Sequence, residues 1–363
     1  MSSKTLSKVN IHNVYGRSYA ATNNRAVLLI NLGSPRSPKV KDVASYLREF
    51  LMDERVIGLS PFWRSVLVKG IIVPFRAKRS ARNYSYIWDE EQEVFPLVHH
   101  SALLAEALSE QMKRPVGLAM RYGTPSMDDT LLELSQLGVK EVSVLPLYPH
   151  YTRSSFETAA VHALDRLSAL GLDMELSVMD AFYEEEAYNR VLVEQVRRHL
   201  PEDIDRLIIS MHGIPVSHLM PPCRSHNGET KHCIHSHHTP QQRATCYRLH
   251  CETSAERLRQ GLGLPESKVE LVYQSRLGNH EWMRPYFIER VKCFAGEGAK
   301  RIAVVCPGFI CDCLETLHEI DVEYRRDFMH TGGHQMTYIP CLNSSPELVE
   351  ALSEIIYKHE KRL

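Results

Sequence analysis

The sequence lacks several features that would assign the chain to a large class of proteins. It contains no uncharged apolar run of roughly 18 residues, the length that a membrane-spanning helix needs. Residues 1–24 are polar and hold no apolar core of a secretory signal, so we expect a cytoplasmic protein. Neither charge is in excess, because 43 Lys and Arg stand against 44 Asp and Glu. This balance argues against a protein that binds nucleic acid by neutralising many phosphates.

Phosphate-binding loops are also missing. No G-x-G-x-x-G follows a predicted strand and no G-x-x-x-x-G-K-[ST] occurs, so we expect neither a nucleotide nor a dinucleotide partner. By contrast, histidine and cysteine are abundant, with 19 and 9 residues. Eight of these histidines and four of these cysteines fall between His212 and Cys251. Metal chemistry is therefore the first functional class to consider.

Apolar runs of strand length alternate with helical patterns along most of the chain. The predicted strands cover residues 25–33, 116–122, 141–147, 175–182, 206–211, 269–274 and 301–306. Strands separated by helices form parallel sheets through right-handed crossovers. Because 363 residues exceed one ordinary core, we expect two similar α/β domains, over 1–170 and 171–343, and a terminal helix over 344–363 that packs back on them. Ligands of such sheets bind at the carboxyl ends of the strands, where the strand order reverses.

One histidine stands at such a strand end. His212 lies in the motif SMHGIP, directly after an apolar run, and Gly213 and Pro215 favour a sharp turn behind it. A group that titrates near neutrality suits proton transfer at this edge of the sheet. The alternative is a structural histidine that caps the turn, which is the commoner role for an isolated histidine.

A line of carboxylates follows the predicted strand over 301–306. If a helix begins near Asp312, the spacing of the acidic residues places four of them on one face: Asp312, Glu315, Glu319 and Glu323. A solvated helix face is the ordinary explanation of such a stripe. Its start at a strand end instead favours a role in steering a divalent cation or relaying protons. Crowding of like charges would also raise at least one carboxyl pKa.

Four further loops after predicted strands are rich in Gly, Pro and aromatic residues. They are NLGSP (31–35), MRYGTP (120–125), PLYPHY (146–151) and YQSRLGNHEW (273–282). Each alone could be a turn packed on a core. Together they would line one cleft with Tyr, Trp and Arg side chains, which suits a flat, apolar ligand that carries carboxylates.

These motifs, in this order, resemble those of the ferrochelatases, which insert ferrous iron into protoporphyrin IX to make protohaem in the last step of haem biosynthesis. YSYIW (84–88) and LETLHEIDVEY (314–324) belong to the same pattern, and the resemblance extends from residue 25 to the C-terminal helix. It implies an α/β fold of two similar Rossmann-like domains, each a parallel sheet flanked by helices, with the porphyrin between them. It also implies a lyase-class metal chelatase whose partners are protoporphyrin IX and Fe²⁺ as substrate.

The resemblance assigns roles to individual residues. His212 matches the family's active-site histidine, which is thought to accept pyrrole protons or to meet the metal, and Glu315 matches the glutamate that faces it across the porphyrin. Both are therefore expected to contact the substrate iron. The acidic path for protons or metal behind them falls on Asp312, Glu319 and Glu323. The porphyrin-contacting positions fall on Tyr84, Arg121, Tyr122, Tyr151 and Trp282. The sequence departs from the family at Cys313 and His318, where histidine and tyrosine are common.

Residues 56–75 resemble the apolar lip over the family's cleft. Two prolines and two cations interrupt the apolar residues of this segment: Pro61, Arg64, Lys69 and Pro74. By itself the pattern predicts either an amphipathic core helix or a lip that touches a membrane surface. The resemblance favours the lip, and with it peripheral contact with the inner membrane.

Residues 220–251 form an insert that is longer than the corresponding loop of the family and rich in soft metal ligands. Its cysteines are Cys223, Cys233, Cys246 and Cys251. Four thiolates suit tetrahedral Zn²⁺ or a [2Fe–2S] cluster, and free thiols in a solvated histidine loop are the third alternative. Structural zinc sites usually have closer cysteine pairs than these. Because some bacterial ferrochelatases carry a [2Fe–2S] cluster in an internal segment, the resemblance favours the cluster.

Three functions are consistent with the sequence. The first is a ferrochelatase, the second a chelatase that acts on coproporphyrin or sirohydrochlorin, and the third a non-catalytic iron–sulfur sensor on the same scaffold. The presence of both His212 and Glu315 favours catalysis, since a sensor would not need the pair. The sequence leaves the role of the cluster and the oligomeric state open.

Overall fold

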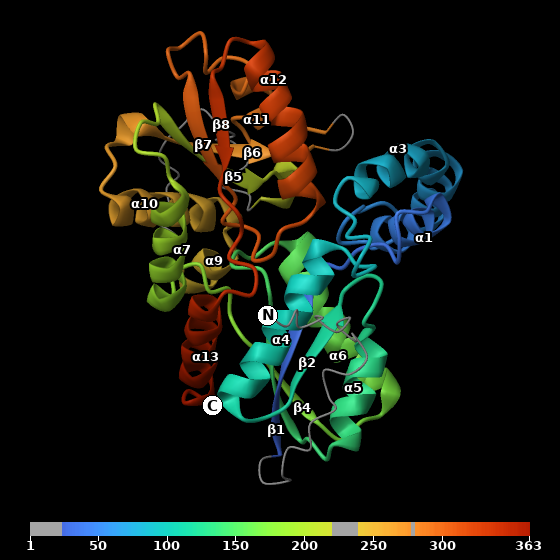
Figure 1. Ribbon diagram of the computed structural model, residues 1–363. Coiled ribbons are helices and arrows are strands. Elements are labelled where there is room, and N and C mark those ends of the chain that lie inside the picture. Colours follow the sequence, from blue (N-terminus) through green and yellow to red (C-terminus); the bar gives the residue numbers. More distant parts are fainter. Residues whose placement is uncertain (1–23, 220–238, 277–279) are drawn as a thin grey trace, which may run out of the picture. The chain divides into compact units, whose positions relative to one another are not determined.

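The computed structural model describes residues 24–219, 239–276 and 280–363, and the chain divides into two compact units (Figure 1). Unit 1 comprises Met1–Pro146 and Thr158–Val178, and unit 2 comprises Leu147–Glu157 and Met179–Leu363. By their contacts, residues 147–157 thus belong to unit 2 and residues 171–178 to unit 1. The sequence predicted one crossing between the domains, after residue 170.

Unit 1 is built on a four-stranded parallel sheet with strand order β2-β1-β3-β4. Its strands are β1 (Arg25–Asn31), β2 (Val116–Met120), β3 (Glu141–Pro146) and β4 (Glu175–Val178). Residues 26–30 of the central strand β1 are completely buried. A central parallel strand is covered on both faces, which explains why these segments are near-continuous apolar runs in the sequence.

Helices cover this sheet and also form an arm before β2. They are α1 (Val40–Leu51), α2 (Pro61–Ser65), the π-helix η1 (Val66–Ile72), α3 (Val73–Ser85), α4 (Pro96–Met112), α5 (Met127–Gln136) and α6 (Thr158–Leu170). The arm consists of α2, η1 and α3, which follow one another without a break, and α3 packs against α1. It contains residues 61–75 of the predicted lip.

Unit 2 repeats the arrangement with strand order β6-β5-β7-β8. Its strands are β5 (Arg206–His212), β6 (Val269–Gln274), β7 (Arg301–Val305) and β8 (Gln335–Tyr338). As in unit 1, the first strand lies between the second and the third, and all neighbours are parallel. The predicted class, two similar α/β domains each with a parallel sheet flanked by helices, is therefore confirmed.

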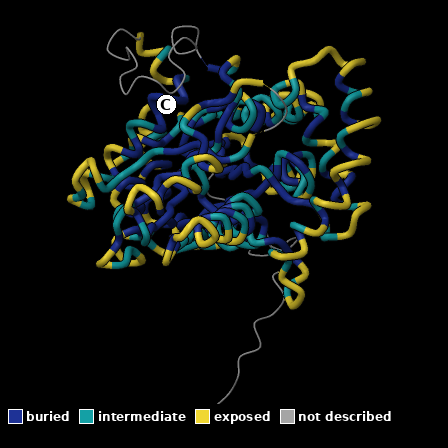
Figure 2. Tube along the Cα trace, turned by 90° about the horizontal axis from the view of Figure 1, so that it is seen from above, coloured by how far each residue is buried: buried dark blue, intermediate teal, exposed yellow. Residues whose placement is uncertain are grey.

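The helices of unit 2 surround its sheet and bury an apolar core against it. They are α7 (Glu186–His199), α9 (Pro240–Thr245), α10 (Tyr247–Leu262), α11 (Phe287–Arg290), the π-helix η6 (Glu315–Tyr324), α12 (Arg325–His330) and α13 (Pro346–Glu360), with the short π-helix η2 (Arg153–Glu157) and the 3₁₀-helices η3 (Val216–His218) and η5 (Glu266–Lys268). Ile208, Val272, Phe287 and Phe328 belong to the core and are completely buried. Residues 26–30 of β1 and 207–211 of β5 are buried, whereas exposed residues gather on the outward-facing stretches of the trace (Figure 2).

The sheet of unit 2 has its switch point between β5 and β7, because the chain leaves β5 for one side of the sheet and β7 lies on the other. β5 ends with His212, and the segment that leads to the predicted acidic stripe follows β7. The two candidate motifs of unit 2 thus begin at adjacent strand ends. This is the position at which open α/β sheets bind their ligands.

The acidic stripe differs from the prediction in its helix type. The sequence predicted an α-helix from about Asp312, whereas the structure has a π-helix that begins at Glu315. A spacing of four residues keeps side chains near one face in either helix, so the sequence could not distinguish them. Asp312 precedes the helix and is held separately.

Candidate active site

His212 is the last residue of β5 and its side chain is half-buried. The Nδ1 atom of the imidazole lies 2.6 Å from the carbonyl oxygen of Gly213. A carbonyl oxygen only accepts hydrogen bonds, so Nδ1 carries the ring proton of the neutral imidazole. The lone pair is then on Nε2, the atom that can accept a proton or bind a metal ion.

The turn after His212 is tightly enclosed by β6 and the segment behind it. A Cβ atom at Gly213 would lie 3.1 Å from the carbonyl oxygens of both Gln274 and Ser275, so glycine is the residue that fits this approach. Pro215 and Trp282 form an antiparallel bridge, and Trp282 is nearly buried. Trp282 therefore packs beside the turn that carries His212.

Glu319 is the best-connected carboxylate of the acidic stripe. Ser275 Oγ donates to Glu319 Oε2 at 2.6 Å, and the Tyr324 hydroxyl donates to Oε1 at 2.7 Å. Burial raises the pKa of the Glu319 carboxyl above its usual value, although these hydrogen bonds act against it. His212 and Glu315 both lie close enough to shift the pKa of Glu319: His212 lowers it when the ring is protonated, and the Glu315 carboxylate raises it. Glu315, Glu319 and His212 thus form one electrostatic group.

Asp312 occupies a different environment from the rest of the stripe. It is buried, and its Oδ2 accepts a hydrogen bond from Asn343 at 2.7 Å. Its Oδ1 accepts from the hydroxyls of Tyr338, at 2.5 Å, and Thr316, at 3.2 Å. With these partners Asp312 anchors the loop between β7 and η6. Glu323 is four residues beyond Glu319 on η6 and is partly exposed.

Unit 1 contains a buried ion pair that the sequence did not reveal. Arg121 Nη2 contacts Asp53 Oδ2 at 2.5 Å, and the same oxygen accepts from the hydroxyls of Tyr122, at 2.8 Å, and Thr158, at 2.5 Å. Burial acts to raise the pKa of the Asp53 carboxyl, but the hydrogen bonds and the Arg121 charge outweigh it, and the net pKa is lowered. Nothing in the local sequence distinguishes Asp53 from the adjacent Glu54, so sequence reasoning missed it.

Three of the predicted porphyrin contacts lie near this ion pair or in the surrounding core. The Arg121 guanidinium is 4.4 Å from the centre of the Tyr122 ring, and Tyr122 is completely buried. Tyr84 on α3 is also buried, with its ring 5.1 Å from that of Phe95. Tyr151, in unit 2, donates its hydroxyl to Glu157. The structure therefore accounts for the packing of these residues, and their contact with a porphyrin stays a prediction.

Two of the four cysteines predicted as cluster ligands lie in the described chain. Cys246 is the residue that caps the start of α10 and Cys251 lies in its second turn, and both are buried. Cys223 and Cys233 lie outside the described residues. Within the described ranges, no three His, Cys, Asp or Glu side chains are grouped so that they could hold a metal ion.

His250 lies beside these cysteines, and its two ring nitrogens have partners. Nδ1 accepts from the backbone N–H of Tyr151 at 3.1 Å, and Nε2 donates to the carbonyl of Arg243 at 2.9 Å. Burial lowers the pKa of His250, which is consistent with a neutral ring. In this arrangement His250 cannot replace a thiolate as a metal ligand.

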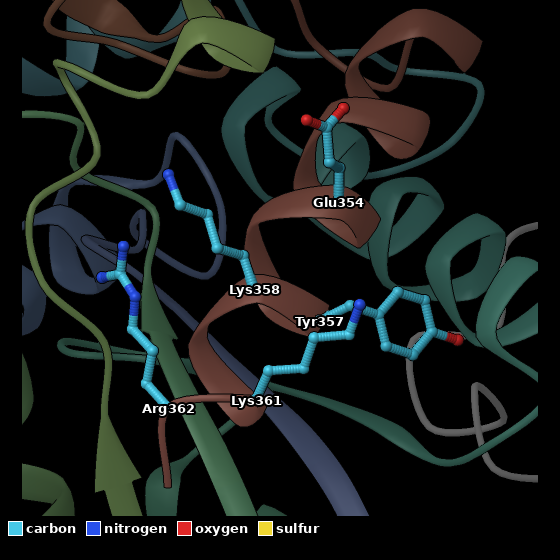
Figure 3. A pocket seen from close by; sticks show the side chains of 5 residues that line it. All are labelled: Glu354, Tyr357, Lys358, Lys361 and Arg362. Carbon is cyan, nitrogen blue, oxygen red and sulfur yellow. The ribbon is translucent and has the colours of Figure 1, made fainter.

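One hollow on the surface of the described chain is lined by none of the predicted site residues. A hollow of about 560 Å³ at the end of α13 is lined by Glu354, Tyr357, Lys358, Lys361 and Arg362 (Figure 3). Lys358 already forms an ion pair with Glu185 at 2.5 Å. Among the helices of the described chain, none is both long enough and apolar enough to cross a bilayer.

Comparison with known proteins shows that the chain is similar to one family over nearly its full length. A family model described as Ferrochelatase matches residues 24–360. The chain is 44% identical over 338 residues to a ferrochelatase of Porphyromonas gingivalis, covering 91% of this chain and 95% of that protein. It is 39% identical over 335 residues to a ferrochelatase of Pseudomonas savastanoi, covering 92% and 97%. A solved structure described as SirB from Bacillus subtilis with Fe3+ shares the fold, with a TM-score of 0.51 at 10% identity over 92% of this chain and 94% of that one.

Proposed function

The chain belongs to the ferrochelatase family, and from this premise we infer that it is an enzyme that inserts Fe²⁺ into protoporphyrin IX to give protohaem. The reaction replaces two pyrrole N–H protons by one metal ion, so it needs a bent macrocycle and an acceptor for protons. The observation that carries the proposal is the position of His212 at the switch point of unit 2, beside Glu315 and Glu319.

We propose that His212 acts as the proton acceptor or the metal-facing group of this reaction. The Gly213 carbonyl holds the proton on Nδ1, which leaves the Nε2 lone pair for a pyrrole proton or for the substrate iron. Glu315 would face the same substrate atoms. Glu319, whose pKa is raised by burial, would accept a proton from the site, and the hydroxyls of Ser275 and Tyr324, which donate to its two oxygens, would hold it in place.

The remaining predicted residues would bind and bend the macrocycle. Bending directs the pyrrole lone pairs towards the metal and is a form of strain that contacts away from the reacting centre must supply. Trp282 and Tyr151 are candidates for contact with the macrocycle faces, with Tyr84 and Tyr122 as buried support. Because Arg121 is already paired with Asp53, a porphyrin propionate would share its guanidinium with that carboxylate.

The substrate is tested by comparing iron insertion into protoporphyrin IX, coproporphyrin and sirohydrochlorin at matched concentrations without oxygen. The proposal predicts the highest kcat/KM for protoporphyrin. A higher kcat/KM for either other tetrapyrrole would replace it with the corresponding chelatase. Binding of iron or porphyrin with no turnover on any of the three would favour the sensor.

We also propose that the insert binds a [2Fe–2S] cluster through Cys223, Cys233, Cys246 and Cys251. The support from the described residues is that Cys246 and Cys251 are buried near each other at the start of one helix, and that His250 is already occupied. Burial raises the pKa of the Cys251 thiol and thus favours its protonated form. A metal that binds this sulfur would therefore have to displace the thiol proton. When bound, a cluster would supply a covalent link between the two halves of the insert. Zinc and free thiols stay the alternatives.

Protein purified without oxygen is expected to be coloured and to contain two iron and two sulfide per chain, as the composition of the cluster requires. Cys251→Ser should remove the colour, whereas Cys293→Ser, at an exposed free cysteine, should keep it. Iron, sulfide, zinc and the visible spectrum are measured on the same samples. Colourless native protein with intact cysteines would contradict the cluster, and stoichiometric zinc would favour the second alternative.

We further propose that the lip (residues 56–75, continuing into α3) contacts an anionic bilayer peripherally, which for a cytoplasmic enzyme is the inner membrane. Its apolar side chains are unusually exposed, with 66% for Phe62, 62% for Trp63 and 80% for Phe75. No acidic residue occurs between Glu54 and Asp89. The same stretch carries exposed cations at Lys69, Arg76, Lys78, Arg79 and Arg82. Exposed aromatic residues beside cations suit a surface of anionic lipid.

Contact between the lip and a bilayer is tested by sedimentation of the protein with lipid vesicles. The native chain should bind vesicles that contain phosphatidylglycerol more tightly than vesicles of phosphatidylcholine alone. The double variant Trp63→Ala/Phe75→Ala should weaken binding by at least about tenfold, because each side chain loses apolar burial. Tyr357→Ala, at an exposed residue of α13, is the matched control. Equal binding of the native chain and the double variant would rule the lip out as the contact.

A further inference from the structure

Tyr247 links the helix of the insert to the candidate catalytic histidine. It is the first residue of α10, and its side chain is buried. Its hydroxyl donates a hydrogen bond to the backbone carbonyl of His212, with 2.7 Å between the two oxygens. No motif in the sequence pointed to Tyr247, because the bond joins residues that are 35 positions apart.

This hydrogen bond completes a clamp on one peptide group. The carbonyl of His212 and the N–H of Gly213 belong to the same planar peptide. The N–H donates to the carbonyl of Gln274, the last residue of β6, at 2.7 Å. Both polar ends of the peptide are therefore held, one by a side chain from α10 and the other by the backbone of β6.

The clamped peptide controls the imidazole in two ways. It begins at the Cα atom from which the His212 side chain extends, and it leads to the Gly213 carbonyl that accepts the Nδ1 proton at 2.6 Å. Rotation of the peptide would move the ring and its acceptor relative to each other. Gly213 lacks a side chain that could restrict this rotation, so the restriction comes from the two hydrogen bonds.

We infer that Tyr247 is a positioning residue, which holds the His212–Gly213 peptide so that Nδ1 stays protonated and Nε2 stays free to react. The inference rests on the proposed function of His212. Tyr247 acts through His212. Its hydroxyl is occupied by other groups of the protein, because it donates to the His212 carbonyl and also contacts the Cys251 thiol. Partners of this kind, one bond removed from the reacting group, typically change activity by about 10- to 100-fold when they are removed.

The test compares Tyr247→Phe with Tyr188→Phe. Tyr188 is also buried and also donates to a backbone carbonyl, that of Pro307, at 2.8 Å, so its variant controls for the loss of a buried hydrogen bond. We expect Tyr247→Phe to lower kcat by about 10- to 100-fold with an unchanged KM for porphyrin. Tyr188→Phe should keep the kcat of the native chain even if both variants unfold at a similarly lower temperature.

A spectroscopic measurement keeps the inference testable apart from turnover and from the metal content of the insert. The ¹⁵N chemical shifts of the His212 ring, assigned with His212→Ala, should show the Nδ1–H tautomer in the native chain and in Tyr188→Phe, and a mixture in Tyr247→Phe. The Nε2–H tautomer in the native chain would overturn the clamp even if Tyr247→Phe cannot be purified. Native-like shifts or native kcat in Tyr247→Phe would also overturn it.

The two proposals fail in different ways in this experiment. If His212→Ala keeps native turnover, the proposed function of His212 is wrong whatever Tyr247 does. If His212→Ala is inactive while Tyr247→Phe matches Tyr188→Phe in kcat and ring shifts, only the role of Tyr247 is wrong.

Discussion

Replacing His212 with alanine is expected to stop iron insertion while the porphyrin still binds. The variant loses the Nε2 lone pair, and loss of a general base typically lowers kcat by about 10²- to 10⁴-fold. The His212 ring is only half-buried, and the centroid of its aromatic neighbour Phe309 is 6.4 Å away. Removal of the ring is therefore expected to cost little stability. Turnover is measured as anaerobic insertion of Fe²⁺ or Zn²⁺, and binding as quenching of porphyrin fluorescence.

The matched control is His330→Ala, which removes an exposed histidine at the end of α12. It should keep both turnover and porphyrin affinity. Near-native turnover in His212→Ala would contradict the assignment of the active site. Loss of porphyrin binding together with turnover would instead make His212 a binding or structural residue.

Replacing Asp53 with alanine is expected to destabilise unit 1 by about 3–5 kcal/mol, the usual cost of removing one partner from a buried ion pair. The variant leaves the guanidinium of Arg121, whose side chain is 14% exposed, without its counter-charge. It also leaves the hydroxyls of Tyr122 and Thr158 without their acceptor. Urea unfolding at pH 7 is followed by the fluorescence of the two tryptophans of unit 1, Trp63 and Trp88.

Glu141→Gln is the control, because it breaks an ion pair with Arg25 of similar length, 2.8 Å, in which both side chains are more than half exposed. Its cost should stay below about 1 kcal/mol. The pKa of Asp53 is lowered from 3.8 in the folded chain, so its contribution is complete above that pH and is lost as the pH falls through the lower native value. The difference between Asp53→Ala and the native chain should therefore shrink in acid. Equal costs for Asp53→Ala and Glu141→Gln at pH 7 would contradict the buried pair.

The sheets were predictable because their central strands are buried on both faces. β1 and β5 are near-continuous apolar runs, which is the pattern that a parallel strand imposes on the sequence. β8 (Gln335–Tyr338) was missed because it has only four residues at the edge of the sheet, of which Met336 alone is fully buried. The predicted terminal helix is present as α13, and its N-cap Ser345 accepts a hydrogen bond from the N–H of Leu348 at 3.3 Å.

The candidate site was predictable only in part, because motifs mark strand ends but do not reveal long-range partners. The sequence pointed to His212 and Glu319 by their places after strands. It could not show that Ser275 and Tyr324 hold Glu319, that Asp53 holds Arg121 from 68 residues away, or that Tyr247 holds the peptide of His212. These partners are set by the packing of distant segments, which no local spacing encodes.

The central claim is that this chain is a catalyst of iron insertion, and repeated turnover tests it most directly. Purified protein is mixed with Fe²⁺ and a large excess of protoporphyrin IX without oxygen, and protohaem is counted per chain over time. We expect many protohaem molecules per chain, formed at a rate proportional to the protein concentration. A yield that stops at one protohaem per chain, or at none, would contradict the account and leave a binding protein on the ferrochelatase scaffold.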